Sequence, residues 1–344
     1  MRVLQAMAGA PVGGAENFFT RLVCALARRG LEQRALIRPD AARGAALAAA
    51  GVAVDTARFG GMLDFATGRI FRRAIDAFRP DIVVSWMNRA TAFCPASHGG
   101  TRFVHVGTPR GYYDPKYYRH CDRLVVTTDD LARFYERAGW SKDRIATIPN
   151  FAPDECAAPV RRASLDTPDG VPLLLALGRL HENKGFDTLI RALARLPDHY
   201  LWLAGDGPLA DSLRRLAAET GIAERVRFLG WRTDTPALYA ACDAFVCPSR
   251  HEPFGNIIVE AWAQRVPVVA SRSEGPGALV EDGTSGLLVA VDDADALAAA
   301  IRRLATEPAL PDRIAAGGRA AYESGFTEDV VVRRYLDLFA RLVR

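Results

Sequence analysis

Two glutamates lie eight positions apart in the stretch HEPFGNIIVEAW, residues 251–262. Glu252 lies in a loop that contains proline and glycine, whereas Glu260 lies in an apolar run that reads as a helix. A carboxylate buried among apolar side chains is costly unless it has a partner. If the helix begins near Asn256, Glu260 is one turn further in and its side chain leans back toward the helix N-terminus. There it could accept hydrogen bonds from a vicinal diol such as a ribose.

The same helix start offers backbone N–H groups to an anion. The first amides of a helix have no partner within the helix, and the helix dipole favours negative charge at that end. The amides of Phe254, Gly255 and Asn256 would therefore point at any anion held beside the loop.

Two cations follow a predicted strand in LALGRLHENKGFDTLIRAL, residues 175–193. Arg179 and Lys184 are five positions apart, and Lys184 is one of only three lysines against 41 arginines in the chain. An arginine fork and a lysine point charge together suit the oxygens of a diphosphate. The alternative is a solvated loop with one salt bridge.

A glycine pair marks a third turn, in GAPVGGAENFF, residues 9–19. Gly13 and Gly14 lie between a predicted strand and a predicted helix, where backbone N–H groups can approach a phosphate. The pattern is not GxGxxG, which argues against a nicotinamide or flavin site. The alternative is a tight turn without a ligand.

Short apolar strands alternate with helical patterns along almost the whole chain, which is typical of a parallel α/β protein. We therefore predict two Rossmann-like domains whose parallel sheets face a central cleft, each with a crevice at the carboxyl ends of its strands. The predicted strands are RVLQAM, QRALI, DIVVSW, TRFVHV, DRLVVTT and RIATIP in the first half, and PLLLALG, YLWLAG, RVRFLG, DAFVCPS, VPVVAS and SGLLVA in the second.

The expected domains follow from the segments between these patterns. The proline-rich segment 150–170 reads as an interdomain linker. The last helical pattern, FTEDVVVRRYLDLFARLV, is expected to pack back on the first domain. The predicted division is 1–160 for acceptor binding, 161–326 for nucleotide-sugar binding, and 327–344 for the returning helix.

Composition and charge limit the kinds of binding partner that this protein is expected to have. A length of 344 residues fits two domains, and six cysteines without a CxxC pair favour neither disulfides nor a zinc site. Residues 1–165 carry 24 Lys and Arg against 15 Asp and Glu, whereas the remainder carries 20 against 25. A basic first half indicates an anionic partner, such as an acidic glycan or a membrane surface, although drift between two domains would also produce it. The sequence has no run of basic residues that would indicate nucleic-acid binding. The N-terminus has no secretory or membrane-spanning pattern, so we expect a cytoplasmic protein.

These motifs resemble those of the retaining GT-B glycosyltransferases of family 4. The resemblance rests on the E-x7-E pattern within PSRHEPFGNIIVEAW, on GRLHENKGF before it and on EDGTSGLLV after it. It covers nearly the whole chain, from GGAE through RIATIPNF to FTEDVVVRRY. The tract RGYYDPKYYRHCDRLVVTT is also similar to a bacterial subgroup that builds envelope glycans.

The resemblance implies roles for several of these residues. The Gly13–Gly14 turn would meet the distal phosphate, while Arg179 and Lys184 would neutralise the diphosphate leaving group. Glu252 would contact hydroxyls of the donor sugar and Glu260 would bind the ribose. His105, expected at the end of the strand TRFVHV, falls where members place a histidine near the sugar and the acceptor, although VGTPRG follows it where an acid is typical.

Base contacts are expected from the backbone around Arg227 and Phe228. No metal is expected, because no DxD motif ends a strand near these groups and VDDAD, residues 291–295, lies at a predicted helix start. The positive charge would instead come from side chains and helix termini.

The resulting prediction is a retaining, hexosyl-type glycosyltransferase that needs no cofactor and uses a nucleotide sugar, with a UDP-sugar favoured. It would act on a glycan or an anionic, lipid-linked acceptor in lipopolysaccharide or other surface polysaccharide synthesis, with peripheral contact to the inner face of the cytoplasmic membrane. The basic, tyrosine-rich run RGYYDPKYYR is the candidate acceptor or membrane surface. The alternatives are a nucleotide-sugar epimerase of the same fold and a non-catalytic, nucleotide-binding regulator.

Overall fold

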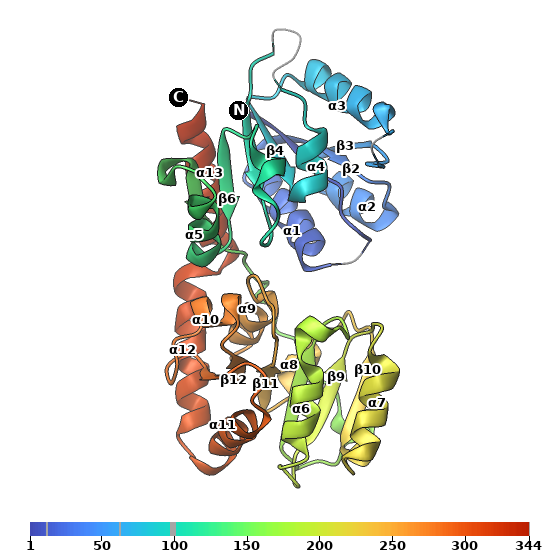
Figure 1. The fold of residues 1–344 in the computed structure, drawn as a ribbon, viewed down its shortest axis with the longest axis vertical. Helices are drawn as coiled ribbons and strands as arrows, with labels where there is room; N and C mark the ends of the chain where they lie inside the picture. The colour runs from blue at the N-terminus through green and yellow to red at the C-terminus, as the bar shows by residue number, and fades with distance from the viewer. Residues whose placement is uncertain (12, 62, 97–100, 344) are drawn as a thin grey trace. The chain divides into compact units, whose positions relative to one another are not determined.

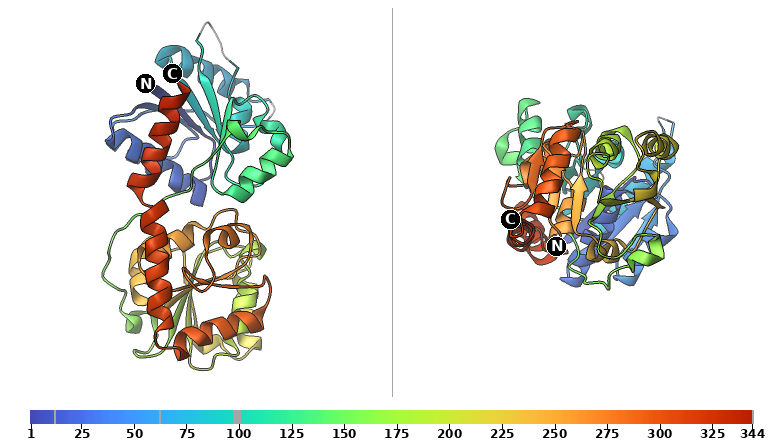
Figure 2. Two further views of the ribbon diagram at one scale, coloured as in Figure 1. Left: turned by 90° about the vertical axis from the view of Figure 1, so that its left-hand side faces the viewer. Right: turned by 90° about the horizontal axis from the view of Figure 1, so that it is seen from below.

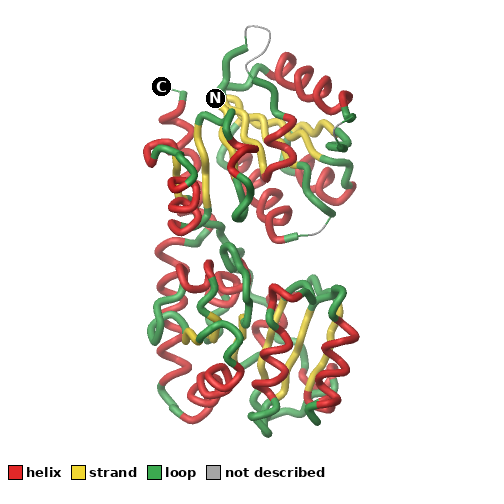
Figure 3. Tube along the Cα trace, viewed as in Figure 1, coloured by secondary structure: helices red, strands yellow, loops and turns green. Residues whose placement is uncertain are grey.

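The structure is a computed structural model that describes residues 1–11, 13–61, 63–96 and 101–343. The chain folds into two compact units, one of Met1–Asn150 with Glu328–Arg344 and one of Phe151–Thr327. Each unit is a parallel sheet covered by helices, as the colouring of Figure 3 makes plain.

The first unit holds a seven-stranded sheet in the order β3-β2-β1-β4-β5-β6-β7, and every pairing is parallel. The strand order therefore reverses between β1 and β4. The strands are β1 (Arg2–Met7), β2 (Glu32–Ile37), β3 (Ala53–Thr56), β4 (Ile82–Trp86), β5 (Val104–Thr108), β6 (Arg123–Val126) and β7 (Ile145–Thr147).

The last helix of the chain belongs to this first unit, so both ends of the chain lie on it (Figures 1 and 2). Helix α13 packs against α1, where Glu328 accepts from Arg28 at 2.7 Å and Asp329 pairs with Arg29. This is the packing expected of the C-terminal helix. The unit's helices are α1 (Gly14–Arg28), α2 (Ala41–Ala49), α3 (Phe65–Phe78), α4 (Met87–Phe93), α5 (Asp129–Arg137) and α13 (Glu328–Leu342), with 3-10 turns η1 (Pro115–Tyr118) and η2 (Lys142–Arg144).

The second unit holds a six-stranded parallel sheet in the order β10-β9-β8-β11-β12-β13. Here the strand order reverses between β8 and β11. The strands are β8 (Leu173–Leu177), β9 (Tyr200–Ala204), β10 (Val226–Gly230), β11 (Ala244–Cys247), β12 (Val268–Ser271) and β13 (Leu287–Val289).

Helices cover both faces of this sheet, and the central strands are apolar throughout because both of their faces are buried. Every residue of β8 is buried, for example. The helices are α6 (Phe186–Leu193), α7 (Ala210–Glu219), α8 (Thr235–Ala241), α9 (Asn256–Ala263), α10 (Glu274–Leu279), α11 (Ala294–Thr306) and α12 (Leu310–Gly325), with 3-10 turns η3 (Arg162–Leu165), η4 (Glu182–Lys184) and η5 (Ala223–Arg225).

All twelve predicted strands are confirmed, and the parallel α/β class with them. The sequence reading missed β3, a short edge strand without a fully buried residue. Except for Asn150, the proline-rich segment expected to link two domains lies within the second unit. There the Arg162 guanidinium donates to the carbonyls of Ala241 and Val171 and pairs with Asp243 at 2.9 Å. Among the described residues, none of the helices is long and apolar enough to cross a membrane.

Candidate functional site

The strand reversal of the second unit brings two predicted site residues into contact. Open α/β sheets bind ligands outside the carboxyl ends of the strands where the strand order reverses. Lys184 follows β8 and Glu252 follows β11, which are the two strands at the reversal. Their side chains form an ion pair and are only 22% and 14% exposed, respectively.

Glu252 sets the charge state of Lys184. Burial alone would lower the pKa of the lysine, but the attraction and hydrogen bond of Glu252, helped by Cys247, outweigh it and raise the pKa above its ordinary value. Lys184 therefore carries a full positive charge at neutral pH. The sequence reading gave the two side chains separate ligand contacts and did not foresee that they pair.

Glycines let the loops at this edge press together. Gly185, at φ 60°, has a left-handed conformation, and a Cβ there would lie well within 3.0 Å of the carbonyl oxygen of Pro248, nearer than real Cβ atoms approach. Gly205, at φ 148° after β9, meets the carbonyl of Gly178 in the same way. The Lys184 turn therefore lies backbone against backbone on the exit from β11.

Arg250 joins the same two loops through its side chain, and the sequence reading missed it. Its guanidinium forms a bidentate pair with Asp187 at 2.8 and 2.7 Å, pairs with Asp292 at 2.6 Å, and donates to the carbonyl of Glu182 at 2.9 Å. Its backbone N–H donates to the carbonyl of Asn183 at 2.8 Å. The only signal in the sequence is an arginine two positions before Glu252.

The loop that carries Glu252 is braced on its other side by α10. The N–H of Gly275 donates to the Glu252 carbonyl at 2.7 Å, and the Glu274 carboxylate accepts from the Glu252 N–H at 3.3 Å. Phe254, predicted as an anion-binding residue through its amide, has a buried ring that lies 6.2 Å from the ring of Phe326. Glu274 was also missed, because nothing in the sequence shows that it folds onto this loop.

Helix α9 begins at Asn256, as predicted, with Gly255 at its N-cap and no side-chain cap. Helix α6 begins in the same way after Gly185. Among the described residues, side chains cap α2 by Asp40, α3 by Asp64, α5 by Thr128 and α11 by Asp293, whereas α4, α7, α8, α10 and α12 also have no side-chain cap. A helix start without a side-chain cap suits an anion, and the two helices at the strand reversal share this feature with those other helices.

Glu260 lies on α9 and is half-buried, so it is not the core carboxylate that its apolar neighbours suggest. Nearby, the Tyr239 hydroxyl donates to the carbonyl of Ile257 at 2.8 Å. Burial, and after it the negative charge of Glu260, raise the pKa of Tyr239. Glu260 is thus at the edge of the apolar core on the first turns of α9.

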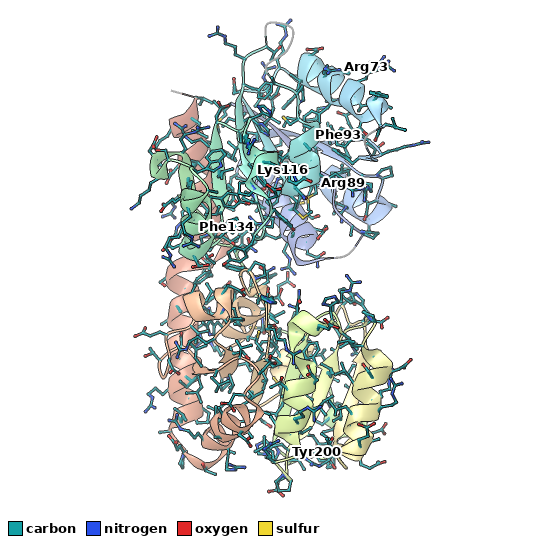
Figure 4. The ribbon with its side chains drawn as sticks, viewed as in Figure 1. Arg73, Arg89, Phe93, Lys116, Phe134 and Tyr200 are labelled. Carbon is teal, nitrogen blue, oxygen red and sulfur yellow. The ribbon has the colours of Figure 1, made fainter. Side chains whose placement is uncertain are left out.

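Three other predicted residues of the second unit form no ion pair with Lys184 or Glu252. Arg179 is exposed and has no ion pair with any residue that the structure describes. The Arg227 guanidinium donates to the carbonyls of Leu165 and Asp166 and lies 5.6 Å from the Tyr200 ring. Tyr200, labelled in Figure 4, begins β9, so the Arg227 side chain extends toward the amino ends of the strands. Phe228 packs on the core beneath Arg214.

The residue that leaves β10 at its carboxyl end is Trp231, which the sequence reading did not single out. It is 56% exposed, which is unusual for so large an apolar side chain. Its position one residue after the predicted strand RVRFLG was the available signal.

In the first unit, the glycine turn leads from β1 into α1 at the strand reversal. Gly13 is the N-cap of α1 and no side chain caps the helix. The Glu16 carboxylate folds back over the turn and accepts from the N–H of Ala10 at 2.9 Å. A Cβ at Gly9 or Gly13 would overlap Glu16, so the glycines make room for this carboxylate. Glu16 was visible in GGAE but was not assigned a role.

His105 is not at the end of a strand, so that expectation is wrong. It is the second residue of β5, whose carboxyl end is Thr108, and it is only 5% exposed. Its Nε2 lies 2.8 Å from the Ser85 hydroxyl, and its backbone N–H donates to Asp122. Burial lowers its pKa to about 4, against the opposing charge of Asp122, so the ring is neutral at physiological pH. These contacts fix the imidazole ring and the backbone of His105 within the sheet.

The run RGYYDPKYYR is partly core. The Arg110 guanidinium is buried 4.9 Å from the Phe18 ring and 5.0 Å from the Trp86 ring, and Tyr118 is fully buried. The Tyr112 hydroxyl donates to Asp130 at 2.6 Å. Lys116, labelled in Figure 4, is exposed and pairs with Asp114 at 2.7 Å. Only part of this run is therefore available to an acceptor or a membrane.

Within the described ranges, no group of three or more His, Cys, Asp or Glu side chains is arranged to hold a metal ion. The acids of VDDAD have other partners, since Asp292 pairs with Arg250 and Asp293 caps α11. None of the six cysteines forms a disulfide.

Comparisons with known proteins agree with this architecture. Residues 13–150 match the family described as glycosyl transferase 4-like domain, and residues 171–307 match glycosyl transferases group 1. The chain is 41% identical to the lipopolysaccharide core biosynthesis glycosyltransferase LpsD of Rhizobium meliloti (strain 1021) over 337 residues, covering 96% of this chain and 95% of LpsD. LpsE of the same organism is 40% identical over 337 residues, covering 95% and 96%. The crystal structure of Anabaena Alr3699/HepE in complex with UDP-glucose superposes with a TM-score of 0.86 at 22% identity, covering 99% of this chain and 100% of that one.

Two Rossmann-like units, each with a parallel sheet, define the GT-B fold of glycosyltransferases. The chain belongs to the group 1 glycosyltransferases, with a 4-like domain in its first unit and a group 1 domain in its second. It is therefore an enzyme that transfers a sugar.

Proposed function

We propose that this protein is a retaining, family 4 glycosyltransferase that moves a hexosyl-type sugar from a UDP-sugar to a hydroxyl of a lipid-linked glycan in lipopolysaccharide core synthesis. The observation that carries the proposal is the Lys184–Glu252 pair at the strand reversal of the second unit, beside two helices without side-chain caps. The relatives LpsD and LpsE are named for lipopolysaccharide core synthesis, and the HepE structure holds UDP-glucose, which supports the acceptor class and the donor.

In this proposal the second unit binds the donor. Lys184 and the exposed Arg179 neutralise the diphosphate, assisted by the first amides of α6 and α9. Glu252 accepts hydrogen bonds from hydroxyls of the donor sugar, and Glu260 accepts them from the ribose. Trp231 offers a face on which the base can stack, in place of contacts from Arg227 and Phe228. The Gly13–Gly14 turn of the first unit offers amides that suit a phosphate.

The transfer breaks the bond between the anomeric carbon and the distal phosphate oxygen, and the electron pair stays on the diphosphate. The acceptor hydroxyl attacks the same face of the sugar, and its proton passes to the departing phosphate oxygen. The configuration is therefore retained. Lys184 stabilises the charge that develops on the diphosphate without a bound metal ion.

The acceptor is proposed to be anionic and held at the cytoplasmic face of the membrane. The excess of basic residues in the first half supports this, and six unpaired cysteines fit a reducing compartment. Arg110 is too buried to meet a membrane, so the exposed Lys116 and Arg119 are the residues to test. Co-sedimentation with anionic vesicles should fall on raising the salt concentration and in Lys116→Glu with Arg119→Glu, since surface charge is screened within about 8 Å at physiological salt. Equal, negligible sedimentation with anionic and neutral vesicles would contradict it.

The first experiment is a panel of nucleotide sugars tested for protection against thermal unfolding. A ligand at 100 times its dissociation constant adds about 2.7 kcal/mol of stability, and UDP-sugars are expected to protect most. UDP release from the protecting sugar nucleotide then separates an enzyme from a nucleotide-binding regulator, which would bind without release or transfer.

The decisive variants are Lys184→Ala and Arg179→Ala, each expected to lower turnover on the order of 100-fold, by analogy with removing one preorganised donor. Lys142→Ala is the matched control, because it removes an exposed lysine of the first unit. Near-normal turnover in both test variants would refute the assignment of the site.

A further inference from the structure

Arg250 connects the two loops that carry the proposed catalytic pair. Its backbone N–H and that of His251 both donate to the carbonyl of Asn183, at 2.8 and 3.1 Å. The exit from β11 is therefore tied by main-chain bonds to the turn that follows β8. Asn183 directly precedes Lys184, so these bonds fix the chain one residue away from the lysine.

The side chain of Arg250 holds the same turn at both of its ends. One nitrogen donates to the carbonyl of Glu182, where η4 begins, and the fork grips Asp187 in the first turn of α6. Lys184 lies between these two anchors. The third side of the guanidinium pairs with Asp292, whose carboxylate also accepts from the Thr188 hydroxyl at 3.0 Å.

Arg250 and Asp187 keep their charges across the neutral range. The hydrogen bond to Asp187 raises the pKa of Arg250. Burial would raise the pKa of Asp187, but the hydrogen bond and charge of Arg250 outweigh it and lower that pKa. The bidentate geometry needs a planar fork, which lysine lacks. The N–H groups of the guanidinium donate to Asp187, Asp292 and the Glu182 carbonyl, and the side chain is only 26% exposed. Arg250 therefore acts on the neighbouring loop rather than on a ligand.

We infer that Arg250 is a positioning residue that holds the Lys184 ammonium in its catalytic place beside Glu252. The inference rests on the proposed role of Lys184 in stabilising the diphosphate. A small displacement of a catalytic group can cost on the order of 100-fold in rate. Since the benefit of Lys184 is realised as the diphosphate departs, loss of the clamp should lower kcat more than it raises KM for the donor.

The chain provides a matched control in Arg195. It pairs with Asp295 and donates to the carbonyl of Arg191, so it also joins the segment of α6 to the segment of residues 292–295. It lies past the C-terminal end of α6, far along the helix from Lys184. Arg195→Lys therefore tests the loss of an arginine fork between the same two segments, in a more exposed ion pair, without touching the Lys184 turn.

The test compares Arg250→Lys with Arg195→Lys in the whole protein by two measurements. Hydrogen exchange reports the turn directly, and amides of residues 182–188 should exchange faster in Arg250→Lys only. UDP release from UDP-glucose should show kcat lowered on the order of 10-fold, with KM changed less than about threefold. Unchanged exchange, an unchanged kcat or an effect equal to that of Arg195→Lys would overturn the inference.

A double-mutant cycle shows whether Arg250 acts through Lys184. In a Lys184→Ala background, Arg250→Lys should add less than about twofold to the loss, because the group that it positions is already absent. Full additivity would contradict positioning and indicate general destabilisation. The two hypotheses fail differently: normal turnover of Lys184→Ala refutes the proposed function, whereas a strong loss in Lys184→Ala with normal Arg250→Lys refutes only the clamp.

Discussion

Replacing Gly185 by alanine tests how tightly the Lys184 turn lies against the exit from β11. Two costs are expected. The left-handed backbone, at φ 60°, disfavours a Cβ by about 1–2 kcal/mol. The new Cβ would also overlap the Pro248 carbonyl oxygen, which is backbone and cannot swing away. Relieving such an overlap in a packed region typically costs about 1–3 kcal/mol.

Comparison with Gly221→Ala separates the cost of the Cβ overlap at Gly185 from the cost of the left-handed backbone. Gly221 has φ 72°, yet a Cβ there would have nothing within 4 Å, so the variant carries the backbone penalty alone. Both variants reduce the entropy of the unfolded chain equally, and that contribution cancels in the comparison. Gly185→Ala should therefore be less stable than Gly221→Ala by about 1–3 kcal/mol.

Thermal unfolding measures this difference, since 1 kcal/mol shifts Tm by about 2–4 °C in a unit of this size. UDP release from UDP-glucose should fall in Gly185→Ala and stay near normal in Gly221→Ala, because the overlap displaces Lys184 from Glu252. Equal Tm values for the two variants would refute the close approach of the loops. Equal stability with a selective loss of turnover would place the cost in the ligand contacts instead.

Three further predictions concern the carboxylates, the buried histidine and metal. Glu260→Gln should weaken UDP binding more than it lowers kcat, because ribose contacts persist from the ground state to the transition state. Glu252→Gln should lower kcat more than it weakens UDP binding. Calorimetry with UDP and steady-state kinetics test this division of roles, and the same phenotype in both variants would contradict it. The pKa of His105 is about 4 in the folded protein against 6.5 ordinarily, so the unfolded chain binds the extra proton between these values and stability should fall by about 3 kcal/mol as pH drops through them. In His105→Gln, chemical unfolding at several pH values should show a smaller decrease in the free energy of unfolding over this pH range. An unchanged decrease would contradict the assignment of this pH dependence to His105. A chelator should change UDP release from UDP-glucose by less than about twofold, since side chains and helix termini carry the charge; loss of activity that only magnesium or manganese restores would contradict this.

The strands were predictable because a buried parallel strand is an apolar run whichever neighbours it has. β3 escaped because its four residues, Ala53–Thr56, form a half-exposed edge strand without such a run. His105 was misplaced because β5 starts later and runs further than the apolar run TRFVHV suggests.

The candidate site was only partly predictable, for a reason that lies in topology. Lys184 and Glu252 are 68 positions apart, and they meet because β8 and β11 are neighbours in the sheet. Neither motif by itself predicts that these two strands are neighbours. The same holds for Arg250, whose partners Asp187 and Asp292 come from distant parts of the chain. Residue types thus indicated the chemistry, whereas the contacts required the fold.

Helices α1, α6 and α9 all have glycine at the N-cap and no side-chain cap, which has a consequence for stability if their amides bind phosphate as proposed. Glycine at an N-cap is only a few tenths of a kcal/mol worse than serine, threonine, aspartate or asparagine. The oxygen of each such side chain, however, would accept hydrogen bonds from the first amides and so compete with an incoming phosphate for the same N–H groups. Gly13→Ser would test this competition, because the extended backbone of Gly13 is one that any residue adopts, but its Cβ would first have to displace the Glu16 carboxylate. In such a variant the side-chain oxygen would occupy the amides that we propose for phosphate binding, and it would therefore act as a built-in competitive inhibitor.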